Sequence, residues 1–265
     1  MDFLTEIMAL KGARLERLKQ SQPVAALRAQ AEDARVNAEP HALRAALGNL
    51  ERINVIAEFK RASPSKGVIR VDVDPAAIAR SYETGGAAAI SALTEEDRFR
   101  GSLDDLRRVR ATVKIPVLRK DFIFDEYQLY EAAAAGADAL LLIVAALDDE
   151  KLAHLRRVTE DDLLMDALVE VHTKDEMRRA RDAGATLIGV NNRDLHTFKV
   201  SLEVAVQLAQ DAPADSLLVA ESGLSSADDL RRLRALGYQG FLIGETLMRA
   251  DDPEGALRRL VSCAS

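Results

Sequence analysis

At 265 residues, with 48% apolar residues, the chain has the length of one barrel-sized domain or two small ones and ample material for a continuous core. Its formal net charge of -7 argues against a nucleic-acid partner, because nucleic-acid-binding surfaces are usually basic. The single cysteine, Cys263, excludes an internal disulfide or thiolate cluster, and no apolar run has the length of a membrane span or signal segment, so we expect a cytoplasmic protein without a membrane partner.

Residues 1–52 form the first segment of the chain and predict two or three helices. Breaks are expected at Ser21-Gln22-Pro23 and near Glu39-Pro40, since proline interrupts a helix. We expect these helices to pack as a cover on the domain that follows. Lining of the mouth of an active site is the alternative.

Eight short apolar runs follow, and helix-like segments alternate with them to the end of the sequence. The strands that we expect are 53–60, 88–92, 115–119, 138–144, 166–171, 187–191, 217–221 and 240–243. Capping residues mark the helix ends: an N-cap and first-turn proline at Asp74-Pro75, an N-cap at Ser225, and C-terminal stops at Gly136, Gly184 and Gly237.

These glycines belong to a repeat. The segments TGGAAAI, AAGADAL, DAGATLI and ALGYQGF align on Gly86, Gly136, Gly184 and Gly237, which are 50, 48 and 53 residues apart. A period near 50 residues equals two βα units, so the sequence predicts a single α/β domain over 1–265, a (βα)8 TIM barrel with residues 1–52 as an N-terminal helical extension. A doubly wound open sheet is the competing architecture, but it gives no reason for eight even units, and no GxGxxG follows the first strand.

Charged residues stand where apolar ones are expected, at the tips of alternate strands. Glu58 and Lys60 share one strand face with Ile56, and Lys120, Glu170 and Glu221 end the third, fifth and seventh strands. Alternate strands fill one interior layer of a barrel, so these side chains are expected to converge at its catalytic face. A ring of ion pairs that merely closes the barrel is the alternative. Mixed charges that perturb one another's pKa values favour an acid-base site.

Two glycine-containing turns indicate an anion site. Ser222 and Gly223 follow the seventh strand, and Gly244 opens a short helix after the eighth. Barrels often hold a phosphate there on backbone N–H groups, which makes a small phosphorylated molecule the expected partner. Asn191 and Arg193 follow the sixth strand, and an arginine at this place is suited to binding a carboxylate.

The motifs IAEFKRASPSKG, VLRKDFIFDEYQLYEA, LVEVH, GVNNRDLHTF, VAESGL and FLIGETLM, in order from about residue 50 to 250, closely resemble the indole-3-glycerol phosphate synthase family of tryptophan biosynthesis. The resemblance implies a carboxy-lyase that closes the ring of 1-(2-carboxyphenylamino)-1-deoxyribulose 5-phosphate, with loss of carbon dioxide and water, to give indole-3-glycerol phosphate. It implies no cofactor and no metal.

The same resemblance implies roles for single residues. Lys120 matches the general acid and Glu170 the general base, with Glu58, Lys60, Asn191 and Glu221 as supporting polar groups. Ser63, Ser222, Gly223 and Gly244 match positions that contact substrate or phosphate. Glu245 departs from family members that carry serine, which puts a side-chain contact to phosphate at that position in doubt and leaves backbone contacts possible.

The chemistry of such a reaction fits this inventory. A lysine flanked by carboxylates stays protonated despite burial and can donate to a ketone oxygen, while Lys60 and Arg193 are candidates for the substrate carboxylate. Phe99, Phe122 and Leu195 follow strand ends and are expected to wall the flat ring, unless they are only core residues. Residues 61–67 begin the longest βα loop, which is typical of a lid.

Two other functions stay open on the sequence. One is an isomerase of a related aminoaldose phosphate, which would share the phosphate loops but typically needs an Asp or Cys acid-base pair. The other is a non-catalytic barrel that binds or scaffolds, which the charged strand tips disfavour. The sequence predicts no oligomeric state, and a monomer is compatible with it.

Overall fold

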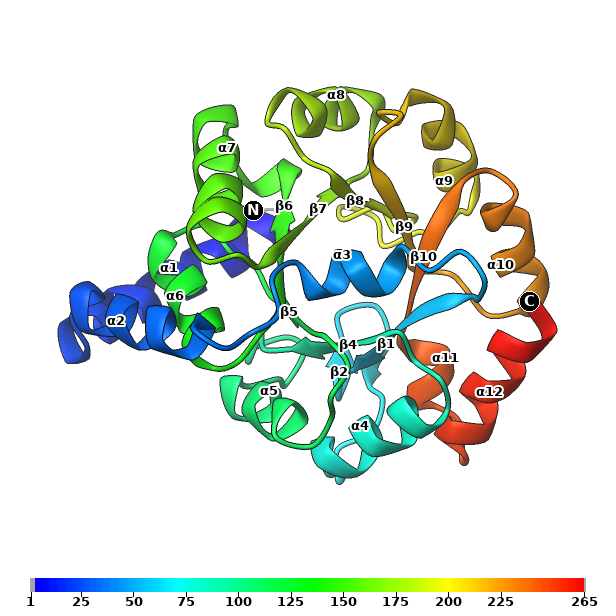
Figure 1. Ribbon diagram of the computed structural model, residues 1–265, viewed down its shortest axis with the longest axis horizontal. Coiled ribbons are helices and arrows are strands. Elements are labelled where there is room, and N and C mark those ends of the chain that lie inside the picture. The colour runs from blue at the N-terminus through cyan, green and yellow to red at the C-terminus, as the bar shows by residue number, and fades with distance from the viewer. Residues whose placement is uncertain (1–2, 265) are drawn as a thin grey trace.

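The computed structural model describes residues 3–264, and its centre is a closed barrel of eight parallel strands (Figure 1). The barrel strands are β1 (Asn54–Phe59), β4 (Ala89–Leu93), β5 (Val117–Lys120), β6 (Ala139–Ile143), β7 (Asp166–Val171), β8 (Leu187–Asn191), β9 (Leu217–Glu221) and β10 (Tyr238–Ile243). Neighbours along the chain are neighbours in the barrel, and β1 pairs with both β4 and β10 to close it. The predicted barrel is therefore confirmed and the open sheet is wrong. Strand ends differ from the expected ones by at most two residues.

Helices surround this barrel. They are α4 (Pro75–Thr84), α5 (Leu103–Arg110), α6 (Glu126–Ala134), α7 (Asp149–Arg157), α8 (Lys174–Asp182), α9 (Glu203–Leu208), α10 (Ala227–Arg234) and α12 (Pro253–Ala264), while α11 (Glu245–Met248) is a short helix directly after β10. Three further short segments are η1 (Val144–Ala146), η2 (Val158–Asp162) and η3 (Ala209–Asp211).

Local capping chemistry sets where these helices begin. Asp74 accepts a backbone N–H from the first turn of α4, and Pro75 opens that helix, as predicted. The prediction of Ser225 as an N-cap is wrong, because Ser226 caps α10. The Ser226 hydroxyl accepts the N–H of Asp229 at 3.2 Å, and the Asp229 carboxylate accepts the N–H of Ser226 at 2.9 Å, so the two residues form a capping box.

The four repeated glycines follow helices and precede every second barrel strand. Gly86, Gly136, Gly184 and Gly237 have φ angles of 96°, 86°, 80° and 99°. Glycine adopts this left-handed region without the steric cost that a Cβ brings. The spacing seen in the sequence thus reflects one such turn for each pair of βα units.

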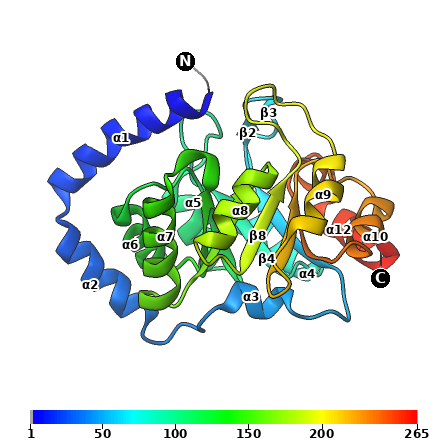
Figure 2. The same ribbon diagram turned by 90° about the horizontal axis from the view of Figure 1, so that it is seen from above.

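The N-terminal segment wraps around the outside of the barrel. It consists of α1 (Phe3–Ser21), α2 (Val24–Arg35) and α3 (Ala42–Leu47), with the breaks where the sequence predicts them. Figure 2 shows α1 on the side of the hairpin β2 (Ala62–Ser63) and β3 (Gly67–Val68), whereas α3 lies at the opposite end of the barrel. Helix α2 packs on α6 between these ends. Among residues 3–264, no helix has both the length and the apolar character needed to cross a membrane.

Alternation along the strands divides the core in two. Val55, Ala57 and Phe59 of β1 belong to the layer between strands and helices, and Ile56 belongs to the cluster inside the barrel. Leu43 and Leu47 of α3 join this inner cluster and cover its base. Glu58 continues the inward face of β1 above Ile56, which is the arrangement that the sequence predicts.

Candidate active site

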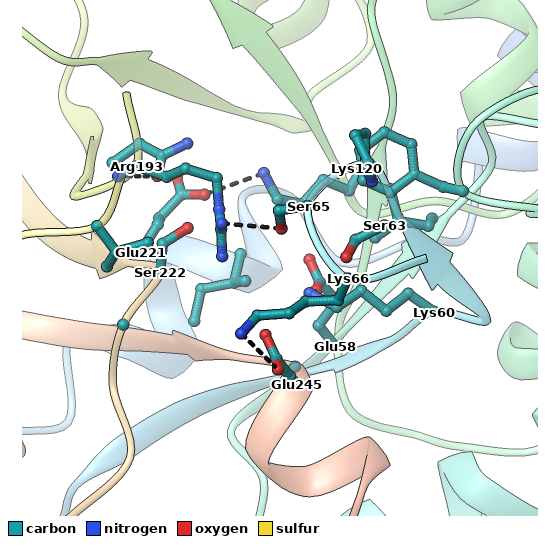
Figure 3. A pocket seen from close by; sticks show the side chains of 18 of the residues that line it. Glu58, Lys60, Ser63, Ser65, Lys66, Lys120, Arg193, Glu221, Ser222 and Glu245 are labelled. Atoms are coloured by element: carbon teal, nitrogen blue, oxygen red, sulfur yellow. Dashed lines mark hydrogen bonds and ion pairs between the residues drawn. The ribbon is translucent and has the colours of Figure 1, made fainter. Parts of the chain in front are cut away.

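A cavity of about 750 Å³ opens at the carboxyl ends of the barrel strands. Its lining contains every site residue that the sequence predicts: Glu58, Lys60, Ser63, Phe99, Lys120, Phe122, Glu170, Asn191, Arg193, Leu195, Glu221, Ser222, Gly223, Gly244 and Glu245. Figure 3 shows how side chains from both sides of the barrel point toward one another across this space. The structure brings the predicted set together, and the role of each residue stays a prediction.

Lys120 lies at the centre of the charged groups on the cavity floor. Its Nζ is 3.2 Å from Glu170 Oε2 and 3.0 Å from Glu221 Oε2. Burial opposes the charge of Lys120, but the two carboxylates outweigh burial and raise the pKa of the ammonium above its ordinary value. Lys120 is therefore a protonated donor held between two acceptors.

The two carboxylates differ in their electrostatics although both are buried. Burial would raise the pKa of Glu170, yet Lys120, His172 and a hydrogen bond with Asn191 together lower it. Burial dominates at Glu221, and with repulsion from Glu170 it raises the pKa of Glu221 to about 7 against the attraction of Lys120. Of the two, Glu170 is thus the more readily ionised and Glu221 the more readily protonated.

Two glycines make room for these acids. A Cβ on Gly189 in β8 would overlap Glu221 Oε1, and a Cβ on Gly244 would overlap Glu58 Oε1 and lie 2.9 Å from Glu58 Cδ. Glu58 in turn forms an ion pair with Lys60, two residues on. Sequence reasoning identified Gly244 as a turn residue but missed Gly189, because the need for space at that position arises from a neighbouring strand.

The far end of the cavity carries the predicted anion loops. Ser222 and Gly223 have φ angles of 64° and 80°, which turn the chain sharply after β9. The Thr246 hydroxyl donates to Leu224 O at 3.1 Å and ties this turn to α11. Glu245 Oε1 lies 3.1 Å from Arg249 Nε and 3.8 Å from Lys66 Nζ, two cations that the sequence reasoning did not single out.

Arg193 connects two loops over the cavity. The backbone N–H of Arg193 donates to Asn191 Oδ1 at 3.0 Å, and its guanidinium donates to Ser65 Oγ at 3.0 Å and to Phe198 O at 3.3 Å. Ser65 belongs to the turn of the β2-β3 hairpin, so the long βα loop is organised and joined to the loop after β8.

Aromatic rings form one wall of the cavity. Phe99 and Phe122 are tilted with centroids 6.3 Å apart, and Leu195 also lines this space. Phe3 of α1 packs edge-on against Phe122 at 6.0 Å and against Phe198 at 5.2 Å. The N-terminal segment therefore both covers the barrel and lines its mouth, which the sequence left as alternatives. Phe3 carries no pattern that would have identified it.

A buried ionic network fixes α1 behind Lys120. Asp121, which follows Lys120 in the chain, is 2.6 Å from Lys11 Nζ and 3.2 Å from the Arg119 guanidinium. The Thr94 hydroxyl donates to the same carboxylate at 2.6 Å. The two cations and these hydrogen bonds outweigh burial and lower the pKa of Asp121, so it stays ionised.

The fold is a TIM barrel, the architecture of many enzymes. A buried lysine and two carboxylates lie at the carboxyl ends of its strands, which makes this cavity a candidate acid-base site. Solved structures with the same fold include 3-hexulose-6-phosphate synthase from Salmonella typhimurium, with a TM-score of 0.65 at 13% identity over 80% of this chain and 98% of that one. Thiamine phosphate pyrophosphorylase from Pyrococcus furiosus has a TM-score of 0.59 at 17% identity over 78% of this chain and 93% of that one.

Sequence comparison gives the family. The family model "Indole-3-glycerol phosphate synthase" matches residues 4–260. Proteins of that name are 46% identical in Carboxydothermus hydrogenoformans, over 98% of this chain and 100% of the relative, and 53% identical in Koribacter versatilis, over 79% and 80%. The one from Leifsonia xyli is 49% identical over 95% of both chains.

The chain belongs to the indole-3-glycerol phosphate synthase family. It is a carboxy-lyase that forms indole-3-glycerol phosphate in tryptophan biosynthesis, and its substrate is a small phosphorylated molecule. The resemblance found in the sequence is confirmed, and the isomerase and the non-catalytic barrel are set aside.

Proposed function

We infer that Lys120 is the general acid and Glu170 the general base for ring closure of 1-(2-carboxyphenylamino)-1-deoxyribulose 5-phosphate. The observation that carries this assignment is the placement of Lys120 Nζ between Glu170 and Glu221 on the cavity floor. Two neighbouring carboxylates favour the protonated form of Lys120, and the lowered pKa of Glu170 favours its ionised form. Lys120 is therefore suited to donating a proton and Glu170 to accepting one.

Ring closure is the first step. The ring carbon that bears the carboxylate attacks the ketone carbon, the carbonyl π pair moves to oxygen, and Lys120 donates a proton to that oxygen. The C–C bond to the carboxylate then breaks, carbon dioxide leaves, and the bonding pair restores the aromatic ring. Lys120 acts where negative charge develops, so its contribution belongs mainly to the transition state.

Loss of water is the second step. The hydroxyl group formed from the ketone leaves with a proton, and a proton is taken from the neighbouring carbon as the indole becomes aromatic. Glu170 is the ionised acceptor for that proton. Glu221, with its pKa of about 7, holds a proton beside Lys120 that can accompany the leaving hydroxyl. Asn191 orients Glu170 by its hydrogen bond.

The remaining residues hold the substrate. We place the phosphate between the turn at Ser222 and Gly223 and the start of α11 at Gly244, with Ser63 at the edge of the cavity. Lys60 and Arg193 face the substrate carboxylate, and Glu58 fixes Lys60 through their ion pair. Phe99, Phe122 and Leu195 contact the flat ring. Every acid and base in this scheme is a side chain of the protein.

We assign the enzyme to the cytoplasm.

Turnover of the Glu170→Gln variant tests the assignment. The chain contains no tryptophan, so the fluorescence of the indole product rises over a low background. A positioned base contributes about a hundredfold to ten-thousandfold, so kcat should fall by that factor with little change in KM. The matched control is Glu150→Gln on the exposed side of α7, which should keep the wild-type rate. A folded Glu170→Gln variant with wild-type kcat would show that Glu170 is not the base.

A further inference from the structure

Glu170 has a neighbour on the side away from Lys120. Its Oε2 faces Lys120 at 3.2 Å, and its Oε1 lies 3.5 Å from His172 Nε2. His172 is two residues further along the chain, so its side chain leaves the backbone on the same side as Glu170 just after β7 ends. Only 12% of the His172 side chain is exposed, and His172 is absent from the cavity lining. It therefore contacts the base without contacting the space for the substrate.

Helix α8 holds the imidazole in place. The Glu176 carboxylate accepts the backbone N–H of His172 at 2.7 Å and lies 3.3 Å from His172 Nδ1. Thr173 caps the same helix by accepting the N–H of Glu176, which fixes the first turn from which Glu176 reaches back. With Nδ1 committed to Glu176, Nε2 is the ring nitrogen that faces Glu170.

We propose that His172 is a positioning residue that decides which of the two carboxylates beside Lys120 is ionised. It holds Glu170 Oε1, so that Oε2 stays directed at Lys120, and in its charged form it favours the ionised form of Glu170 over that of Glu221. The proposal rests on the assignment of Glu170 as the base. A Glu176-His172-Glu170 chain then connects α8 to the reacting centre.

The surrounding charges support a protonated His172. Acidic groups face it from two elements: Glu176 on α8, and Glu170 and Glu221 at the ends of the barrel strands. Burial opposes the charge, but these carboxylates outweigh burial and raise the pKa of His172 above its ordinary value. His172 in turn helps to lower the pKa of Glu170, with which it forms an ion pair, while burial and repulsion from Glu170 raise the pKa of Glu221 to about 7. Two acids that share one lysine divide a proton unequally, and the ion pair with His172 adds to the asymmetry in favour of an ionised Glu170.

The pH profile of kcat/KM tests this role. In His172→Phe the cation beside Glu170 is lost, the pKa of Glu170 rises, and the base is protonated at a higher pH. The acidic limb should therefore move up by about one pH unit, and the loss of rate should be largest on that limb. Glu176→Gln keeps an acceptor for the backbone N–H of His172 but removes the charge, so it should move the limb in the same direction by less. The control is His154→Gln, which changes an exposed His-Glu pair with Glu126 and should leave the profile unchanged.

The imidazole titration gives a readout that needs no turnover. The chain has four histidines, so NMR resolves the ring signals and the His172 variant identifies the relevant one. His172 should titrate above the ordinary value of 6.5 in the wild type and at lower pH in both Glu176→Gln and Glu170→Gln. The proposal is overturned if the acidic limb does not move in folded His172→Phe, or if the pKa of His172 is the same in Glu170→Gln as in the wild type. In both cases the assignment of Glu170 as the base stands. Full turnover by Glu170→Gln overturns the base assignment and the proposal with it.

Discussion

Gly189→Ala is a small substitution that should reach the reacting centre. The new Cβ would overlap Glu221 Oε1, and it would lie 3.3 Å from both Glu221 Cδ and Leu168 Cδ1, so a carboxylate with 1% exposure has to withdraw by roughly 1 Å. Overpacking of this kind costs about 1–3 kcal/mol of unfolding free energy. Because Glu221 Oε2 is 3.0 Å from Lys120 Nζ, the shift also displaces the proposed acid, and misplacement by about 1 Å can lower the rate about a hundredfold.

Two measurements test this expectation. Thermal unfolding should show a midpoint lowered by several degrees, and the fluorescence assay should show kcat lowered by about a hundredfold with a smaller change in KM. Gly12→Ala is the matched control, since a Cβ at that position in α1 meets no atom within 4 Å, and it should be neutral or slightly stabilising. A Gly189→Ala variant with wild-type kcat would refute the claim that the absence of a side chain at this position makes room for Glu221.

Three further outcomes are expected. Inorganic phosphate should compete with substrate, and Glu245→Ser should tighten phosphate inhibition about fivefold. The substitution removes a partly exposed negative charge whose repulsion of the bound anion is about 1 kcal/mol. Unchanged inhibition would place the anion elsewhere. Lys11→Met should destabilise the protein by about 3 kcal/mol in denaturant unfolding, since it removes a partner of buried Asp121, whereas Lys11→Arg should restore most of this. The pKa of Glu221 is raised from its ordinary 4.5 to about 7, so between these pH values the unfolded state loses this proton more readily than the folded state. The unfolding free energy of the wild type minus that of Glu221→Gln should therefore fall as pH rises from 4.5 to 7, and a constant difference would contradict the raised pKa.

The barrel could be predicted because its signals are local and repeated. Each strand is a short apolar run, and a left-handed glycine such as Gly136 or Gly184 marks every second unit. The inward direction of Glu58 follows from alternation with Ile56. The error at Ser225 has a local cause as well. Two serines precede α10, and only the capping box with Asp229 distinguishes Ser226 as the cap.

The missed residues depend on contacts between distant segments. Lys11 is one of several charged residues in an amphipathic helix, and its ion pair with Asp121 joins positions that nothing in the sequence relates. Phe3 lines the cavity because the N-terminal end of α1 lies on the side of the barrel that carries the β2-β3 hairpin (Figure 2). His172 belongs to the LVEVH motif, but its contact with Glu170 depends on how Glu176 of α8 orients the imidazole ring. Sequence alternation predicts which face a residue occupies, and packing decides what it touches there.

The assignment of the proposed acid is tested most directly by comparing Lys120→Ala with Lys60→Ala in steady-state turnover, with folding checked by circular dichroism. Lys120 lies between Glu170 and Glu221, whereas Lys60 pairs with Glu58 at the cavity wall. We expect Lys120→Ala to lower kcat by about a hundredfold to ten-thousandfold and Lys60→Ala mainly to raise KM. The assignment would be contradicted if Lys120→Ala kept a kcat near that of the wild type while Lys60→Ala lost activity at saturating substrate. Lys60 would then be the acid.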